Sequence, residues 1–146
     1  MIIALASDHA GFAYKEKVKT LLTTLGIPFK DFGTHSANSV DYPDYAHIAS
    51  EAISNGECTQ GIFVCGSGIG MSIVANKHKN VRAAVCESII AAELSRKHNN
   101  ANVLCFGERL VSWETAEQMV KIFLETSFEG GRHSGRVEKI HSLTGC

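Results

Sequence analysis

The residues best suited to chemistry lie in the stretch 61–71, where a cysteine is followed by closely spaced glycines. Cys65 ends an apolar run, and Gly66, Gly68 and Gly70 follow it at alternate positions. A glycine loop between a strand and a helix presents backbone N–H groups to an anion. A thiol beside such donors suits proton transfer or nucleophilic attack. The stretch therefore predicts a cysteine-centred site, with a buried and inert thiol as the competing interpretation.

The same loop partly fits the dinucleotide-binding fingerprint. Gly66 and Gly68 match its first two glycines, and Glu87 lies at a suitable distance along the chain to contact ribose hydroxyls. Met71, however, stands where the third glycine normally allows a helix to pack closely on a strand. A nicotinamide-dependent oxidoreductase is therefore the weaker hypothesis for this loop.

The elements that must position the loop follow from the hydrophobic pattern. Strands are expected at residues 2–6, 27–32, 62–65, 81–86 and 102–106. Helices are expected at residues 12–25, 44–55, 72–77, 88–97 and 112–126, with a last helix ending near 143. This alternation predicts an α/β fold: one domain over residues 1–146 with a doubly wound, Rossmann-like, five-stranded parallel sheet and helices on both faces. The extra C-terminal helix has little of its own domain to cover, so we expect it to pack across a neighbouring subunit.

Such a sheet gathers several candidate residues at one edge. Parallel strands deliver their carboxyl ends to the same side, where ligands bind in open α/β sheets. That edge would bring together Asp8 and His9, the loop after Cys65, and Glu108 and Arg109. The sequence therefore predicts a crevice that combines a thiol with carboxylates and a cation.

Other candidates have structural alternatives. Arg132 and Arg136 are four residues apart, so a helix would let both grip a phosphate, or they would form a solvated face. Asp8 could cap a helix, Ser67 could bond within its own loop, and His98 could be a helix-end residue favoured by the dipole. No metal is expected, because no pair has local ligand spacing among His9, His98, His133, Cys65 and Asp8.

The composition favours a small-molecule partner. The formal net charge is −1, with 45% hydrophobic and 20% charged residues, which gives no broad attraction to nucleic acid or to a membrane surface. No apolar run approaches the length of a membrane span, and no signal peptide is evident. The five cysteines are odd in number and form no Cys-x-x-Cys pair, so reduced thiols and a cytoplasmic location are expected.

Dispersed motifs carry a resemblance that covers nearly the whole chain. They are Asp8-His9, Asp41-Tyr42-Pro43, Cys65-Gly66-Ser67-Gly68-Ile69-Gly70, Ala75-Asn76-Lys77, Leu94-Ser95-Arg96, His98-Asn99, Asn102-Val103-Leu104, and Glu129-Gly130-Gly131-Arg132 with Arg136. Together and in this order, they resemble the type B ribose-5-phosphate isomerases, a family that includes galactose-6-phosphate and allose-6-phosphate isomerases.

The resemblance implies a cofactor-free and metal-free aldose–ketose isomerase of the pentose phosphate pathway, which interconverts ribose 5-phosphate and ribulose 5-phosphate. It also implies a homodimer whose two active sites each draw on both subunits; further pairing of dimers stays open. In this resemblance Cys65 is the base that moves a proton through an enediolate, His98 opens the sugar ring, and Ser67 stands in the catalytic loop. The implied substrate contacts are Asp8 near the ring oxygen, Gly66, Ser67, Gly68, Ile69, Gly70 and Asn99 around the oxyanion, and His9, Arg109, Arg132 and Arg136 on the phosphate.

Two features place the chain within that family, and two alternatives stay open. Ser67 stands where many relatives have threonine, which keeps the hydroxyl. The residues after the glycine loop offer Met71 and no carboxylate, so the chain resembles the branch that uses cysteine as the base. A hexose 6-phosphate, allose or galactose, is an alternative substrate. A nucleotide- or phosphate-binding module without turnover is an alternative function.

Overall fold

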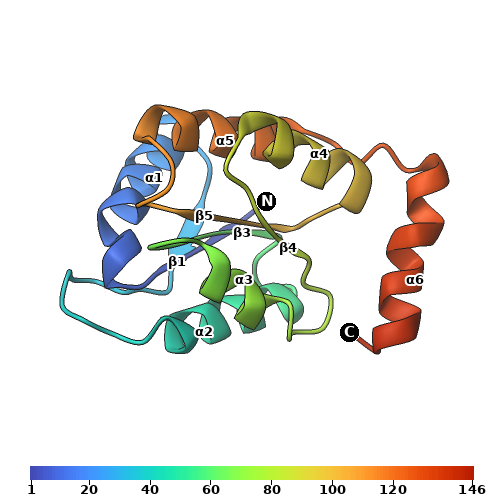
Figure 1. Ribbon diagram of the computed structural model, residues 1–146, viewed down its shortest axis with the longest axis horizontal. Helices are drawn as coiled ribbons and strands as arrows, with labels where there is room; N and C mark the ends of the chain where they lie inside the picture. The colour runs from blue at the N-terminus through green and yellow to red at the C-terminus, as the bar shows by residue number, and fades with distance from the viewer.

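The computed structural model describes residues 1–146 and shows a five-stranded sheet between two layers of helices (Figure 1). All neighbouring strands are parallel, and their order is β2-β1-β3-β5-β4. The strands are β1 (Ile3–Ser7), β2 (Phe29–Asp31), β3 (Gln60–Cys65), β4 (Ala83–Val85) and β5 (Val103–Gly107). The predicted doubly wound α/β fold is confirmed, and the strand expected at residues 27–32 is the short edge strand β2.

The helices divide between the two faces according to the direction of each crossover. The connections that move one way across the sheet carry α2 (Tyr42–Ser54) and α3 (Ile69–Ala75), and those that move back carry α1 (Phe12–Thr24) and α4 (Ile89–Asn99). Because parallel crossovers are right-handed, the two directions place their helices on opposite faces. α5 (Trp113–Glu125) joins α1 and α4 above the sheet in Figure 1. Two short 3₁₀ turns, η1 (His9–Gly11) and η2 (Gly131–His133), precede α1 and α6 (Ser134–Thr144).

Strand alternation sorts the core into two apolar clusters. Along β3, Ile62 and Val64 join the cluster under α1, α4 and α5, whereas Phe63 and Cys65 join the cluster over α2 and α3. This is the period of two expected for a strand that is buried on both faces. Cys65 is therefore the last inward residue of the central strand, on the face that α3 covers.

Three helix boundaries differ from the sequence prediction. α3 begins at Ile69 rather than 72, because Gly68 adopts the left-handed conformation (φ 78°) and the chain turns into a helix directly after it. α2 begins at Tyr42 with Asp41 in the N-cap position, so Asp44 lies in the first turn and is not the cap. α4 runs through Asn99, so the left-handed residue that ends it is Asn100 (φ 46°). The helices expected from residues 88 and 112 do begin there: Ser88 and Ser112 are their N-caps, and each side chain accepts an N–H from the first turn.

The C-terminal helix α6 stands apart from the sheet at the right of Figure 1, and none of its residues is buried. Its apolar residues Ile140 and Leu143 are exposed. The helix therefore leaves an apolar surface exposed. No helix in the chain is long and apolar enough to cross a membrane.

Candidate active site

Cys65 lies at the floor of a crevice above the carboxyl edge of the sheet. Its side chain is at the end of β3, the residue is 5% exposed, and its Sγ accepts a hydrogen bond from the N–H of Gly68 at 3.0 Å. The crevice encloses about 370 Å³ between β1, β3 and the start of α2. The strand order reverses between β1 and β3, so this is the switch point where doubly wound sheets bind ligands. The thiol is largely buried yet borders the cavity, so a ligand in the crevice can reach it.

The glycine loop keeps its tight course because two positions have no room for a side chain. A Cβ on Gly68 would lie 2.8 Å from the backbone of Phe106, and one on Gly107 would lie 2.6 Å from the oxygen of Gly66. The loop therefore packs directly against the backbone at the end of β5. In that position the N–H groups of Gly66, Ser67 and Gly70 have no hydrogen-bond partner within the chain. Unpaired N–H groups beside a reactive group are what an oxyanion site requires.

Asp8 and Ser67 both make the structural hydrogen bonds that the sequence offered as alternatives to a functional role. Asp8 Oδ1 accepts the N–H groups of Ala10 and Gly11 at 2.9 and 3.1 Å, so it caps η1. Its other oxygen makes no bond in the chain, and the residue lines the crevice. Ser67 Oγ accepts the N–H of Ile69 at 3.3 Å, which leaves its O–H free to donate. For both residues the structural bond and the functional contact are compatible.

The crevice has a cationic rim. Arg109 lies over Gly66, with guanidinium atoms 3.2–3.4 Å from the place a Cβ there would occupy, and it forms no ion pair. His9 Nδ1 lies 3.2 Å from both the N and the O of Val40, so the ring holds the end of the loop before α2. An unpaired guanidinium beside an imidazole suits a phosphate group.

Glu108 does not belong to this group, contrary to the sequence prediction. Its Oε2 accepts the N–H of Tyr14 at 3.0 Å in the first turn of α1. The helix has Gly11 at its N-cap and no side-chain cap of its own, so Glu108 supplies the missing acceptor from the end of β5. Its role is to hold α1 against β5.

Sequence reasoning assigned no role to Tyr42, which lines the crevice. Its ring lies 2.7 Å from the place a Cβ on Gly70 would occupy, so only glycine at position 70 leaves room for this ring. The motif Asp41-Tyr42-Pro43 carried the signal, because proline in the first helical turn fixes where α2 begins and therefore where Tyr42 points.

A second group of candidates lies at the opposite edge of the sheet. α4 runs antiparallel to the strands, so its last residues, His98 and Asn99, lie beside the amino end of β5. The His98 ring stacks on that of His133 with centroids 4.4 Å apart and planes 12° from parallel. Arg132 and Arg136 follow in η2 and α6. Within one chain these residues do not join the Cys65 crevice.

The stacked histidines share a carboxylate. Glu129 Oε2 lies 3.9 Å from His98 Nε2 and 3.8 Å from His133 Nε2, and the possible ligand atoms of the three residues lie within 4.8 Å of one another. A metal bound by both imidazoles needs ring planes that converge on it, whereas these are nearly parallel. Desolvation, aided by the neighbouring His98, Arg132 and Arg136, lowers the pKa of His133. The cluster is therefore better described as a stacked pair than as a chelating site.

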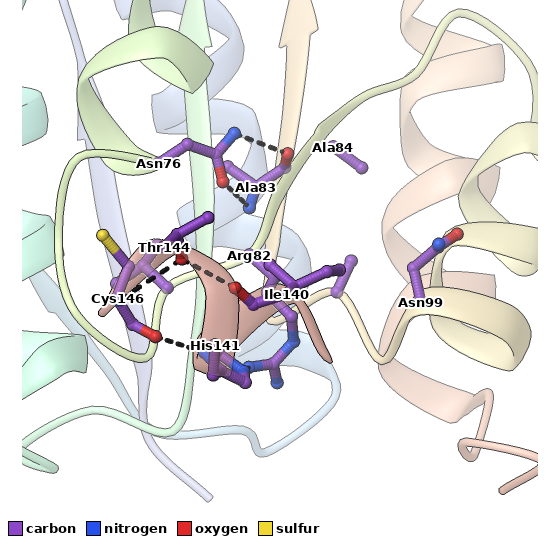
Figure 2. Close-up of a pocket in the computed structure, with 11 residues that line it drawn as sticks. Asn76, Arg82, Ala83, Ala84, Asn99, Ile140, His141, Thr144 and Cys146 are labelled. Atoms are coloured by element: carbon purple, nitrogen blue, oxygen red, sulfur yellow. Dashed lines mark hydrogen bonds between the residues drawn. The ribbon is translucent and has the colours of Figure 1, made fainter. Parts of the chain in front are cut away.

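Asn99 borders a different cavity, of about 380 Å³, between β4 and α6 (Figure 2). Figure 2 shows Asn76 bridging the N–H and the carbonyl of Ala83, and Arg82 reaching His141 on α6. Apart from the terminal Cys146, the cavity contains no nucleophilic thiol. Asn99 therefore belongs, in the single chain, to the same distant edge as His98.

A thiol, free N–H donors and an unpaired cation at the switch point of a doubly wound sheet define an α/β enzyme for a small anionic substrate. The chain belongs to the ribose/galactose isomerase family, whose model matches residues 3–140. It is 44% identical over 141 residues to ribose-5-phosphate isomerase B of Escherichia coli, covering 97% of this chain and 95% of that protein. The resemblance stated from the motifs is thereby confirmed.

Solved structures agree with this assignment. The ribose-5-phosphate isomerase B of Clostridium thermocellum superposes with a TM-score of 0.96 at 45% identity, covering 98% of this chain and 97% of that one. The ribose 5-phosphate isomerase of Thermotoga maritima gives a TM-score of 0.93 at 50% identity and covers 97% of each chain. The similarity includes nearly the whole fold.

Proposed function

We propose that the chain interconverts ribose 5-phosphate and ribulose 5-phosphate. The observation that carries the proposal is the placement of Cys65 Sγ beside the unpaired N–H groups of the glycine loop, in a chain whose relatives are named ribose-5-phosphate isomerases. Both are needed, because the fold alone serves many functions. The reaction is a hydrogen shift within one molecule and consumes no oxidant or reductant.

In the proposed reaction, Cys65 acts as a thiolate on the open-chain aldose. It removes the proton on C2, and the electron pair moves to form a C1–C2 double bond while the aldehyde oxygen becomes the enediolate oxygen. Return of the proton from Cys65 to C1, with transfer of the C2 hydroxyl proton to the C1 oxygen, gives the ketose. Free N–H groups at Gly66, Ser67 and Gly70 stabilise the negative oxygen, where one such donor is typically worth ~3–4 kcal/mol. The Gly68 N–H that reaches Sγ stabilises the thiolate in the same way.

The substrate enters as a ring, and the proposed ring-opening residue is His98. Asp8 has one carboxylate oxygen unused by its cap and is placed to contact the sugar near the ring oxygen. Arg109 and His9 bind the phosphate from one side, and Arg132 and Arg136 from the other. A phosphate held away from the reacting carbons supplies binding energy that orients them.

This scheme needs two copies of the chain, and we infer a homodimer with shared active sites. His98, Asn99, Arg132 and Arg136 lie at the amino edge of the sheet, whereas Cys65 lies at the carboxyl edge. In a symmetric pair, the amino-edge group of one copy can face the crevice of the other, which makes two identical sites. The exposed apolar residues of α6 supply surface for such a contact. The five free cysteines fit a reducing compartment, so we place the dimer in the cytoplasm.

The test is the turnover of Cys65→Ala on a panel of sugar phosphates. Loss of the base is expected to lower kcat by roughly 10²–10⁴, while ribose 5-phosphate still binds. Unchanged turnover would remove Cys65 from the mechanism, and binding without any turnover by the unaltered chain would indicate a phosphate-binding module. Because the family description also names galactose, allose 6-phosphate and galactose 6-phosphate belong in the panel. A higher kcat/KM for either would reassign the substrate to a hexose.

A further inference from the structure

We propose that the chain carries a second anion site, built from Arg82 and Arg96 and suited to a phosphate-class oxyanion. Both side chains line a cavity of about 450 Å³ at the amino edge of the sheet. The remaining lining residues are polar or terminal, and none is a carboxylate: Met1, Thr59, Gln60, Asn100 and Asn102. The reaction proposed above uses none of these residues.

Neither guanidinium has a counter-ion in the chain. Arg82 donates from Nε to the Asn100 carbonyl at 2.9 Å, and its Nη1 lies 3.0 Å from His141 Nε2. Arg96 donates from Nε to the Thr126 carbonyl at 3.3 Å. Its Nη1 donates to Asn100 Oδ1 at 3.0 Å and to the Ala101 carbonyl. All of these acceptors are neutral, and Nη2 of each arginine donates to nothing in the chain. The unused donors are those that a phosphate accepts from the arginine fork.

The two charges also oppose each other. Burial lowers the pKa of Arg82, and burial together with the charge of Arg82 lowers the pKa of Arg96. Two partly desolvated like charges without a counter-ion are unfavourable, and an anion between them removes both penalties. The cavity also holds the Gln60 amide, whose Oε1 is buried and has no partner in the chain, and a singly protonated phosphate could donate its O–H to this acceptor. The two guanidiniums therefore leave the cavity with positive charge that no group of the chain balances.

Occupancy of this site has a structural consequence at the end of α4. Both arginines hold Asn100, the left-handed residue that ends the helix, directly after His98 and Asn99. An anion that tightens the arginine pair therefore stabilises the segment that presents His98. This consequence for catalysis rests on the proposed function, whereas the binding itself does not.

The test follows the arginine side-chain Nε–Hε signals by NMR during a titration with inorganic phosphate at constant ionic strength, set with sodium chloride. The chain has five arginines, and the other three are Arg109, Arg132 and Arg136, so single arginine-to-lysine variants assign the signals. Saturable shifts of the Arg82 and Arg96 signals are expected. Glycerol 3-phosphate is titrated in parallel: equal shifts would identify the ligand as the phosphoryl group of a metabolite, and weaker ones as free phosphate.

A matched pair of variants separates this site from general charge effects. Gln60→Glu places a carboxylate in the cavity at almost unchanged side-chain volume. It should raise the apparent Kd for phosphate, measured at both arginine signals, at least about tenfold. Gln118→Glu adds the same charge at an exposed position on α5 and should leave that Kd unchanged. The proposal is overturned if only the Arg109, Arg132 and Arg136 signals respond, if the shifts rise without saturation, or if both variants behave alike. Circular dichroism verifies that both variants are folded.

Discussion

A dimer in which one copy lacks Cys65 and the other lacks His98 is predicted to keep one intact active site. The structure places these residues at opposite edges of the sheet, so each proposed site takes Cys65 from one copy and His98 from the other. In the heterodimer of Cys65→Ala with His98→Asn, one site therefore receives both lesions. The other site receives neither.

The magnitude follows from counting sites. Each homodimeric parent has two damaged sites, and its kcat should fall by roughly 10²–10⁴. The heterodimer has one intact site of two, so its activity per dimer should be about half of the unaltered value. Its KM for ribose 5-phosphate should match that of the unaltered chain, because the intact site has every contact.

The assay uses two differently tagged chains that are co-expressed, purified in tandem so that only heterodimers remain, and assayed for isomerase activity. The matched control pairs Cys65→Ala with Arg109→Ala, two residues that line the same crevice of the same chain. In that heterodimer every site is damaged, so activity should stay near the level of the parents. The reasoning is refuted if the first heterodimer is no more active than its parents, if the control recovers equally, or if tandem purification yields no heterodimer.

Three further predictions follow from other parts of the structure. Gly68→Ala should lower both kcat and the melting temperature, because Gly68 is left-handed and its new Cβ would meet the Phe106 backbone at 2.8 Å; Gly135→Ala, on α6 in open space, should raise stability by up to ~1 kcal/mol in urea unfolding. Asp31→Asn should cost ~1–3 kcal/mol in urea unfolding at pH 7, because the fully buried Lys15 ammonium loses its carboxylate partner at 2.6 Å and keeps only the partly exposed Glu16 carboxylate at 3.0 Å. Desolvation opposes ionisation of Asp31, but hydrogen bonds from Lys15, Lys19 and the Gly33 N–H outweigh it and lower the pKa of this carboxyl. The stabilisation by ionised Asp31 should therefore be complete above about pH 4 and be lost as the pH falls further. The prediction is contradicted if Asp31→Asn costs as much free energy of unfolding in acid as at about pH 7. Iodoacetamide at neutral pH should inactivate in step with labelling of Cys65 in peptide mass spectra, because burial raises the pKa of Cys86 to about 11 and that of Cys105 well above its usual range; inactivation that instead follows Cys146 would exclude Cys65.

The hydrophobic pattern was sufficient to predict the strands of the sheet. It did not predict where α3 begins, because that boundary depends on the backbone conformation of one glycine. Apolar runs such as 62–65 have only one packing solution between helices, so their strands were predicted within two residues. The start of α3 was missed because the glycine run was taken as loop throughout. In the structure Gly68 provides the turn, and Ile69 and Gly70 already belong to the helix.

Only those site residues that follow a strand could be placed from the sequence, and the reason is geometric. Residues that follow a strand, such as Asp8 and Arg109, were correctly placed at the carboxyl edge because parallel strands share one direction. Glu108 follows the same strand but turns to cap α1, and side-chain direction after a strand is not encoded in spacing. His98 ends a helix rather than a strand, and crossover helices run back, so the end of each helix lies at the opposite edge.

The same geometry links catalysis to assembly. A residue at the end of a crossover helix is separated from its own carboxyl edge by the length of the sheet, and no side-chain rotation removes that distance. It can reach such an edge only on another copy, and a twofold axis that satisfies one site satisfies both. Dissociation of the proposed dimer therefore separates Cys65 from His98 in both sites at once. Activity measured against protein concentration should fall along the same curve as the dimer fraction measured by sedimentation, and a fully active monomer would leave the distant position of His98 without a catalytic explanation.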